Sequence, residues 1–309
     1  MTFFFVLSGF ILVVASEGKN PMNDYSGYFW RRFARIYPIY IVYLILFWSF
    51  IGFSDNLGGK PLLAVILFGF TDLTLTNAWF PQGFMGGLGR DGSWSLSAEV
   101  FFYALFPVML LHARKMSDQG LTTALRWSVA TAALAPVIGR YLPAQGAIPE
   151  TVYYSLPIFR IPEFSAGVFY AVWILRDPAR LPSGRKVIMY LVGLTIFLFL
   201  TARALPPAGF DVLLIPALLV LIAYFLRADE NWASRLLSTR PLVFLGEISF
   251  CIYLMQIFTI NLYRLPGHGA TWMGGVYGCL VMTIVLAAAG HLLIEKPARK
   301  WILSKKASV

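Results

Sequence analysis

Charged residues are scarce in this sequence. They make up 13% of its 309 residues, against roughly a quarter in soluble globular proteins. Apolar residues account for 58%, and the mean hydropathy is +0.70. Because a water-soluble fold of this size could not cover so much apolar surface, the composition excludes a soluble protein. It predicts an integral membrane protein.

Cysteine and histidine are also rare, which bears on redox and metal chemistry. The two cysteines, Cys251 and Cys279, fall inside apolar runs, so we predict buried thiols and no disulfide framework. The three histidines, His112, His268 and His291, are far apart in the sequence and lack the spacing of metal ligands. We therefore predict no metal cofactor.

The excess of basic residues does not indicate a nucleic-acid partner. The net charge is +10, from 25 Lys and Arg against 15 Asp and Glu. These cations lie between hydrophobic runs rather than on one face, which is typical of loops at a membrane surface. The partner that this pattern predicts is membrane lipid.

Ten apolar segments follow one another along the chain, separated by short polar stretches. The third contains Asp72 and Asn77, and we predict a re-entrant or interfacial segment there. The sequence thus predicts an all-α integral membrane protein, a polytopic helical bundle of about nine to ten transmembrane helices, in a single domain over residues 1–309. The segments are 1–15, 36–53, 61–79, 95–111, 122–140, 162–175, 187–202, 209–226, 242–263 and 272–294.

The distribution of basic residues predicts the orientation of the chain. If the loop after the first segment is cytoplasmic and each full span alternates, nineteen of the 25 basic residues lie on the cytoplasmic side. This asymmetry agrees with the positive-inside rule and predicts a cytoplasmic carboxyl terminus. The six on the other side are Lys60, Arg90, Arg140, Arg160, Arg203 and Arg264.

An arginine cluster precedes the second apolar segment, on the predicted cytoplasmic side. Arg31, Arg32 and Arg35 occur together there, and on a helix Arg32 and Arg35 would share one face. Two guanidinium groups side by side suit phosphate or pyrophosphate, because each can donate two hydrogen bonds to an anion. The alternative is that these residues only fix topology or contact anionic lipid.

Three further polar groups lie at or within predicted spans. Glu99 is about one turn inside the outer end of a span, between the aromatic residues Trp94 and Tyr103, and a carboxylate there usually faces a cavity or a partner. Arg160 and Glu163 could form either an ion pair that orients a helix end or a polar substrate site.

Gln256 is the third group, and its position inside a span suits either a hydrogen bond between helices or a contact with substrate.

The order of the sequence motifs indicates a family. Together they are similar to the acyltransferase-3 family of integral membrane acyltransferases, which includes bacterial O-antigen and exopolysaccharide O-acetylases. Six blocks follow one another in family order over nearly the whole chain. They are FFFVLSGFIL (3–12), RRFARIYP (31–38), WSLSAEVFFYALFP (94–107), RIPEFSAG (160–167), LGEISFCIYL (245–254) and IEKPARK (294–300).

The resemblance implies an enzyme of the bacterial inner membrane. Its donor would be cytoplasmic acyl-CoA, usually acetyl-CoA, and its acceptor a hydroxyl of an extracytoplasmic or lipid-linked glycan. Arg32 and Arg35, with Arg31, would then bind the phosphates of CoA, and Glu99 would take an auxiliary catalytic part. The residues expected to contact substrate are Trp94, Tyr103, Arg160, Glu163 and Gln256.

The sequence departs from the family pattern at three points. Gln256 stands where many members carry a histidine, and Thr2 stands where many carry an aspartate. The family's catalytic histidine belongs to a first helix that would precede Met1. We therefore expect the natural protein to extend upstream, through a mis-annotated start or a trimmed end, and the chain as given to transfer little acyl group.

Two other functions are compatible with the same residues. An intramembrane Glu99 and a polar Gln256 could line the pathway of a transporter or flippase. A chain of this family could also persist as a catalytically silent binding or assembly subunit. A binding site for the CoA phosphates would distinguish the acyltransferase from a sugar transporter.

Overall fold

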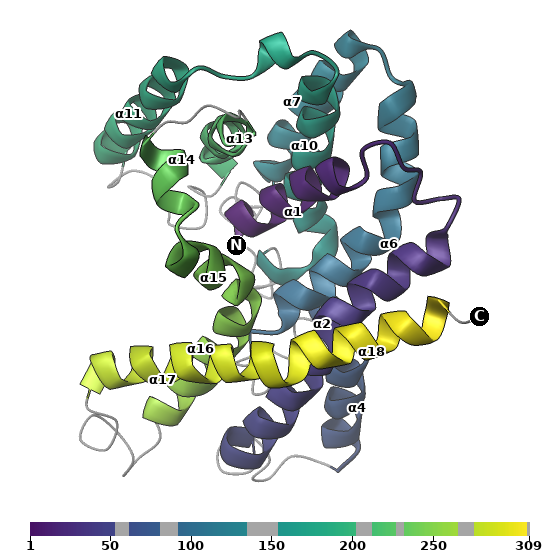
Figure 1. The fold of residues 1–309 in the computed structure, drawn as a ribbon, viewed down its shortest axis with the longest axis vertical. Coiled ribbons are helices and arrows are strands. Elements are labelled where there is room, and N and C mark those ends of the chain that lie inside the picture. The colour runs from purple at the N-terminus through teal and green to yellow at the C-terminus, as the bar shows by residue number, and fades with distance from the viewer. Residues whose placement is uncertain are drawn as a thin grey trace, which may run out of the picture. The chain divides into compact units, whose positions relative to one another are not determined.

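The computed structural model describes residues 1–52, 62–80, 92–134, 154–201, 212–226, 232–264 and 275–307 (Figure 1). Within these ranges every regular element is a helix, so the predicted all-α class is confirmed there. The chain divides into two compact units, Met1–Asp24 with Ser95–Asp229 and Tyr25–Trp94 with Glu230–Val309. Each unit combines two stretches that are distant in the sequence. The single domain over residues 1–309 stays a prediction.

The first unit is built around a close contact between two helices, α1 and α10. Backbones approach so closely that a Cβ atom on Gly9 would lie 2.2 Å from the Phe164 carbonyl oxygen, and one on Gly167 would lie 2.2 Å from the Val6 oxygen. Small residues permit such contacts between membrane helices. The helices of this unit are α1 (Thr2–Ala15), α6 (Trp94–Lys115, its first residue in the second unit), α7 (Asp118–Ala132), α10 (Pro157–Leu175), η4 (Pro178–Arg180), α11 (Gly184–Thr201) and α13 (Ile215–Tyr224).

Arginine side chains fasten the helix ends of this unit. Arg114 donates to the carbonyl oxygens of Ser16 and Lys19 just beyond α1, at 2.7 and 2.6 Å. Arg176 donates to three carbonyl oxygens at the end of α6, including that of Met116 at 2.8 Å. Because the last carbonyls of a helix have no partner within it, these bonds cap α1 and α6.

The second unit contains a long helical rod. Helix α17 (Gly275–Gly290) continues through the π-helical turn η5 (His291–Glu295) into α18 (Lys296–Ala307), and the rod packs against α2 (Tyr25–Phe47) (Figure 1). The other elements are η1 (Trp48–Gly52), α4 (Leu62–Leu73), η2 (Asn77–Trp79), α14 (Trp232–Leu237), α15 (Arg240–Glu247) and α16 (Ser249–Arg264).

Among the residues that the structure describes, four helices are long and apolar enough to span a membrane. A fifth span is possible if α15 and α16, which meet at a bend of 65°, cross together. The predicted count of about nine to ten spans is not confirmed within the described residues, because some of the ten apolar segments contain helices too short to cross alone. The four are 25–50, 94–115, 157–175 and 275–305.

The third apolar segment is one of these short cases. Its helix, α4, has 12 residues and ends at Leu73, and Leu75 then turns the chain with a φ of 53°. At 1.5 Å per residue, such a helix covers only about 18 Å, well short of the bilayer core. The prediction that this segment is not a full span agrees with its length, while its re-entrant course stays a prediction.

Candidate active-site residues

The arginine cluster lies on α2, as the sequence predicted. Arg32 and Arg35 are three residues apart on one continuous helix and therefore share a face. The Arg32 guanidinium is half-buried and sits over the ring of Tyr28, 5.8 Å from its centroid, a cation–π contact that helps to hold its orientation. Arg31 and Arg35 are exposed.

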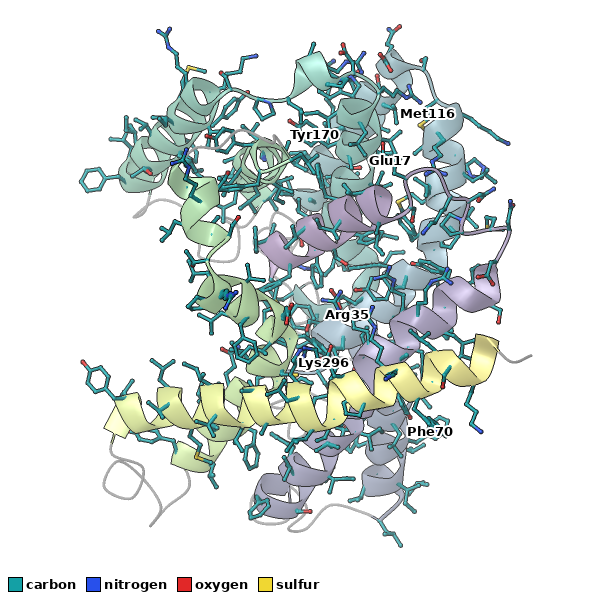
Figure 2. The ribbon with its side chains drawn as sticks, in the orientation of Figure 1. Glu17, Arg35, Phe70, Met116, Tyr170 and Lys296 are labelled. Carbon is teal, nitrogen blue, oxygen red and sulfur yellow. The ribbon has the colours of Figure 1, made fainter. Side chains whose placement is uncertain are left out.

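Arg35 differs from the arginines that cap helices in the first unit. No group among the described residues accepts a hydrogen bond from it, so all of its donors are available. Figure 2 shows Arg35 on α2 and Lys296 at the start of α18, and these two helices pack against each other within the second unit. Lys296 Nζ lies 3.9 Å from Glu247 Oε2, so the positive charge that is free for an anionic ligand is that of Arg35.

A buried polar group lies at the end of α4, and it was not predicted as a unit from the sequence. The Asn77 amide donates to Asp72 Oδ1 at 3.1 Å and to Ser93 Oγ. The Tyr40 hydroxyl of α2 donates to the Asp72 carbonyl oxygen at 2.9 Å. Polar residues within an apolar segment were the available signal, but their partners on other elements could not be read from the sequence.

The motif around Glu99 forms the first turns of α6. Glu99 and Tyr103 are four residues apart on this helix and so share a face, and both are half-buried. The Tyr103 hydroxyl accepts a hydrogen bond from Ser8 of α1 at 3.3 Å. Trp94, the first residue of α6, is also half-buried, but it belongs to the second unit.

Arg160 and Glu163 form the ion pair that the sequence left as one of two alternatives. Arg160 Nη1 is 3.1 Å from Glu163 Oε1. Thr2 completes the group, because its hydroxyl donates to Glu163 and accepts from Arg160, each at 3.3 Å. The Arg160 guanidinium also lies over the rings of Phe5 and Tyr154. The group joins α1 to α10, and Thr2 takes part through its hydroxyl although it carries no charge.

Gln256 lies on α16 with its side chain exposed. The hydrogen bond between α16 and α17 is made by two buried threonine hydroxyls, Thr259 and Thr283, at 2.6 Å. The structure therefore places the polar link between these helices one turn away from Gln256, and a contact of Gln256 with substrate stays a prediction.

The predicted site residues divide between the two units. The first unit holds Glu99 and Tyr103 on α6 and the Arg160–Glu163 pair on α10. The second holds the arginine cluster of α2 together with Trp94 and Gln256. Within the first unit, an ion pair joins Arg160 directly to Glu163.

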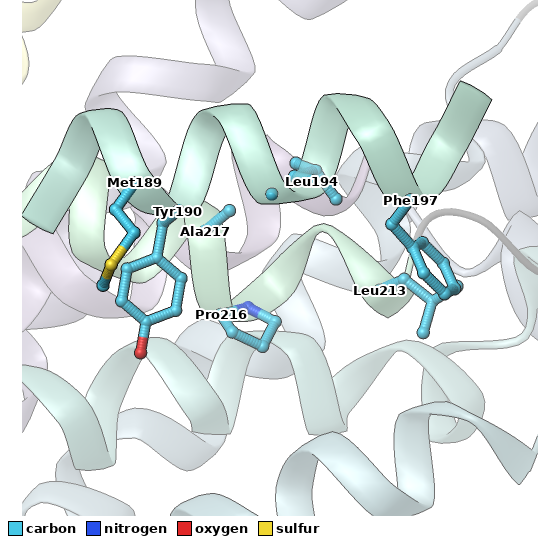
Figure 3. Close-up of a pocket in the computed structure, with 8 residues that line it drawn as sticks. Met189, Tyr190, Leu194, Phe197, Leu213, Pro216 and Ala217 are labelled. Atoms are coloured by element: carbon cyan, nitrogen blue, oxygen red, sulfur yellow. The ribbon is translucent and has the colours of Figure 1, made fainter. Parts of the chain in front are cut away.

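An open apolar cavity of about 410 Å³ lies between α11 and α13 in the first unit (Figure 3). An apolar lining suits hydrocarbon rather than a charged nucleotide or a polar sugar. We therefore place neither donor nor acceptor there. The lining residues are Met189, Tyr190, Gly193, Leu194, Phe197, Leu213, Pro216 and Ala217.

The fold and the polar groups define an all-helical membrane protein with a cationic helix face and buried carboxylates inside apolar helices. Comparison with known families identifies its class. Residues 1–291 match the model of the acyltransferase domain, a family of acyltransferases. The chain belongs to this acyltransferase-3 family, so the resemblance seen in the sequence is confirmed, and an enzyme is favoured over a transporter.

Two curated relatives narrow the comparison. The chain is 28% identical to the acyltransferase MdmB of Streptomyces mycarofaciens, over 96% of this chain and 79% of that protein. It is 23% identical to the peptidoglycan O-acetyltransferase OatA of Listeria monocytogenes, over 96% of this chain and 50% of that protein. The chain thus spans about half the length of the second relative. No solved structure matches it significantly.

Proposed function

We propose that this protein transfers an acyl group, acetyl in the first instance, from acyl-CoA to a hydroxyl of a glycan. The family supports acyl transfer, and the name of the Listeria relative supports a glycan acceptor. In the reaction, the hydroxyl oxygen attacks the thioester carbonyl, the C–S bond breaks, and CoA leaves as the thiol with the proton that the hydroxyl gave up.

The observation that carries the donor assignment is the arginine face of α2. Arg35 has all its donors available, and Arg32 lies on the same face with its fork held over Tyr28. Planar guanidinium groups bind phosphate bidentately, which suits the several phosphates of CoA. An arginine required only for topology would not need this placement on one face.

We assign contacts with the acceptor to residues of α6. Glu99 is half-buried on a membrane-length helix, where a carboxylate is costly unless it serves a partner or a cavity. We assign it the auxiliary role of accepting a hydrogen bond from the sugar hydroxyl or orienting a base. Tyr103, one turn further along the same face, is a second group able to contact a sugar.

The proposal includes an orientation. Arg32 and Arg35 lie near the start of a candidate span, and positively charged loops favour the cytoplasm, where acyl-CoA is available. The acceptor would then lie on the outer face of the bacterial inner membrane or on a lipid carrier. The carboxyl terminus would be cytoplasmic.

Sealed vesicles of defined orientation test donor, acceptor and sidedness together. They are prepared from cells that express the protein from its own gene, isotope-labelled acetyl-CoA is supplied to one face, and label on glycan is measured. We expect transfer only when donor reaches the cytoplasmic face. Arg32→Ala with Arg35→Ala should abolish it, whereas Arg126→Ala, an exposed arginine of α7, should leave it unchanged.

Two results would overturn parts of the proposal. Transfer that is equal with donor on either face would contradict the orientation. Binding of CoA with no transfer to any envelope glycan would instead support a catalytically silent member of the family.

A further inference from the structure

A cluster of metal-ligating side chains in the second unit is not used by the proposed reaction. It consists of Cys251 at the start of α16 and of His291 and Glu295 at the two ends of η5. Their ligand atoms all lie within 4.8 Å of one another, and each residue is at most 5% exposed. No metal site was predicted from the sequence, because the three histidines are far apart and lack the spacing of metal ligands.

We propose that Cys251, His291 and Glu295 bind a divalent transition-metal ion of the zinc class. Thiolate, imidazole and carboxylate are the three ligand types that Zn²⁺ takes from proteins. This inference concerns a separate site and does not depend on the proposed acyl transfer.

The geometry is close to that of a metal site. His291 Nδ1 is 2.7 Å and Cys251 Sγ is 3.3 Å from the same carboxylate oxygen, Glu295 Oε2. Tetrahedral ligands 2.0 to 2.3 Å from zinc are separated from one another by about 3.4 Å. Movements of about an ångström would therefore make room for the ion between these three atoms.

The second ring nitrogen of His291 supports this assignment. Nε2 is buried and has no hydrogen-bond partner among the described residues. If the metal binds Nδ1, then Nε2 carries the proton, and Glu247 Oε2, 4.0 Å away at the end of α15, is the carboxylate that would accept it. Metal-binding histidines commonly donate their other N–H to a carboxylate in this way.

The charges of the cluster also favour a divalent cation. A thiolate, a carboxylate and a neutral imidazole carry two negative charges, which an ion of charge +2 would cancel in a buried setting. The alternative is a protonated His291 between Glu295 and Glu247, with a neutral Cys251 thiol. Both arrangements satisfy the carboxylates, so an experiment that detects the metal itself decides between them.

The structural consequence of the site would be to fasten α16 to the rod formed by α17, η5 and α18. The rod packs closely on α2 beside the cluster, because a Cβ atom at Gly290 would lie 2.8 Å from Ile39 Cδ1. A π-helical turn such as η5 is a frequent feature of functional sites. The metal would therefore hold together helices that pack against α2.

Metal content of the purified protein, after removal of any affinity tag, tests the proposal. Elemental mass spectrometry should find about one zinc ion per chain. Cys251→Ser and His291→Gln should each weaken Zn²⁺ binding more than about tenfold, and Glu247→Gln by about 10- to 100-fold. Matched controls are Cys279→Ser in α17 and His112→Gln in α6, which should bind zinc as the unaltered protein does.

The unaltered protein provides a second test in case a variant fails to fold. It is stripped with a chelator and titrated with Co²⁺, whose bond to a thiolate gives a characteristic near-ultraviolet absorption band. We expect the band to reach its maximum at about one equivalent and to be displaced by Zn²⁺. Substoichiometric metal together with no thiolate band would overturn the proposal and leave the protonated His291 arrangement.

Discussion

Arg160 and Glu163 are joined by an ion pair of 3.1 Å inside the first unit, and their side chains are 7% and 1% exposed. The Thr2 hydroxyl links the pair to α1. Each of these two charged side chains thus already has a partner within the protein, which favours an ion pair that orients a helix end over a substrate site. Removing one member would leave the other as a buried charge without its partner.

We expect Glu163→Gln to destabilise the protein by about 3–5 kcal/mol, because breaking a buried ion pair strands the remaining charge. Arg160→Met alone should cost a similar amount. The combined variant should cost less than the sum of the two, as measured by unfolding in detergent. Additive losses would show that the pair is not coupled, and near-neutral stability with lost transfer would favour a substrate site.

Replacing Arg32 or Arg35 by alanine should weaken acyl-CoA binding about tenfold or more, because each charge-assisted contact to phosphate contributes about 1.5–3 kcal/mol. Lysine should restore binding only in part, since it lacks the planar fork. Dissociation constants measured by calorimetry provide the test, with Arg126→Ala as the control. An unchanged dissociation constant for acyl-CoA in a folded double variant would contradict a donor site on α2.

Glu99→Gln should reduce turnover while leaving folding intact. The substitution keeps the size of the side chain and removes its charge, so an interaction made during transfer is weakened without a cavity. General acid–base and orienting groups contribute about 10²- to 10⁴-fold to such reactions. The measurement is the rate of acyl transfer at saturating donor. Wild-type kinetics in this variant would contradict a role of Glu99 in turnover and indicate a residue that only lies at the membrane edge.

Lowering the pH should loosen the junction between α7 and the end of α10. Asp118 accepts hydrogen bonds from Arg180 at 2.5 Å and Arg176 at 2.7 Å, and these, the Arg180 bond first, hold its pKa below the ordinary value. Its contribution to stability is therefore complete above the unfolded-state pKa of about 4 and is lost as the pH falls through the lower folded-state pKa.

The comparison that checks this is the melting temperature as a function of pH for the unaltered protein and for Asp118→Asn. The variant should be less stable at neutral pH, and the two curves should converge in acid. Parallel curves over the whole range would show that Asp118 makes no contribution that depends on its charge.

A methyl group at either glycine of the α1–α10 contact should impair folding. Gly9→Ala and Gly167→Ala each place a Cβ atom 2.2 Å from a backbone carbonyl oxygen, so the helices must separate. Overpacking of this kind costs about 1–3 kcal/mol or more. Gly193→Ala in α11 is the matched control, because its Cβ would meet nothing within 4 Å. Equal yields and melting temperatures for all three variants would contradict the contact.

Sequence periodicity and composition predicted a large part of the fold. Each of the ten apolar segments contains a helix in the described residues, because a chain in lipid must satisfy its backbone polar groups internally. The number of spans was not predictable in the same way. Hydropathy reports how apolar a segment is, whereas the length of its helix depends on where turns interrupt it, as at Leu75.

The candidate site was predictable where its residues are neighbours in the sequence. The shared face of Arg32 and Arg35 follows from helical spacing alone. The same spacing offered an ion pair of Arg160 with Glu163 as one of two alternatives, and the structure shows that the pair forms. The spacing could not indicate that Thr2 completes that pair, because the contact spans 161 residues along the chain between Thr2 and Glu163.

The sequence by itself determined the helical class, the family and the basic face of α2, since these depend on composition and local periodicity. Only the tertiary structure decided which buried polar groups meet. Asp72 with Asn77 and Ser93, and Cys251 with His291 and Glu295, come together because packing of apolar helix faces fixes where each helix lies. Polar side chains then satisfy one another across the contact, since an unpaired polar group is costly inside apolar surroundings.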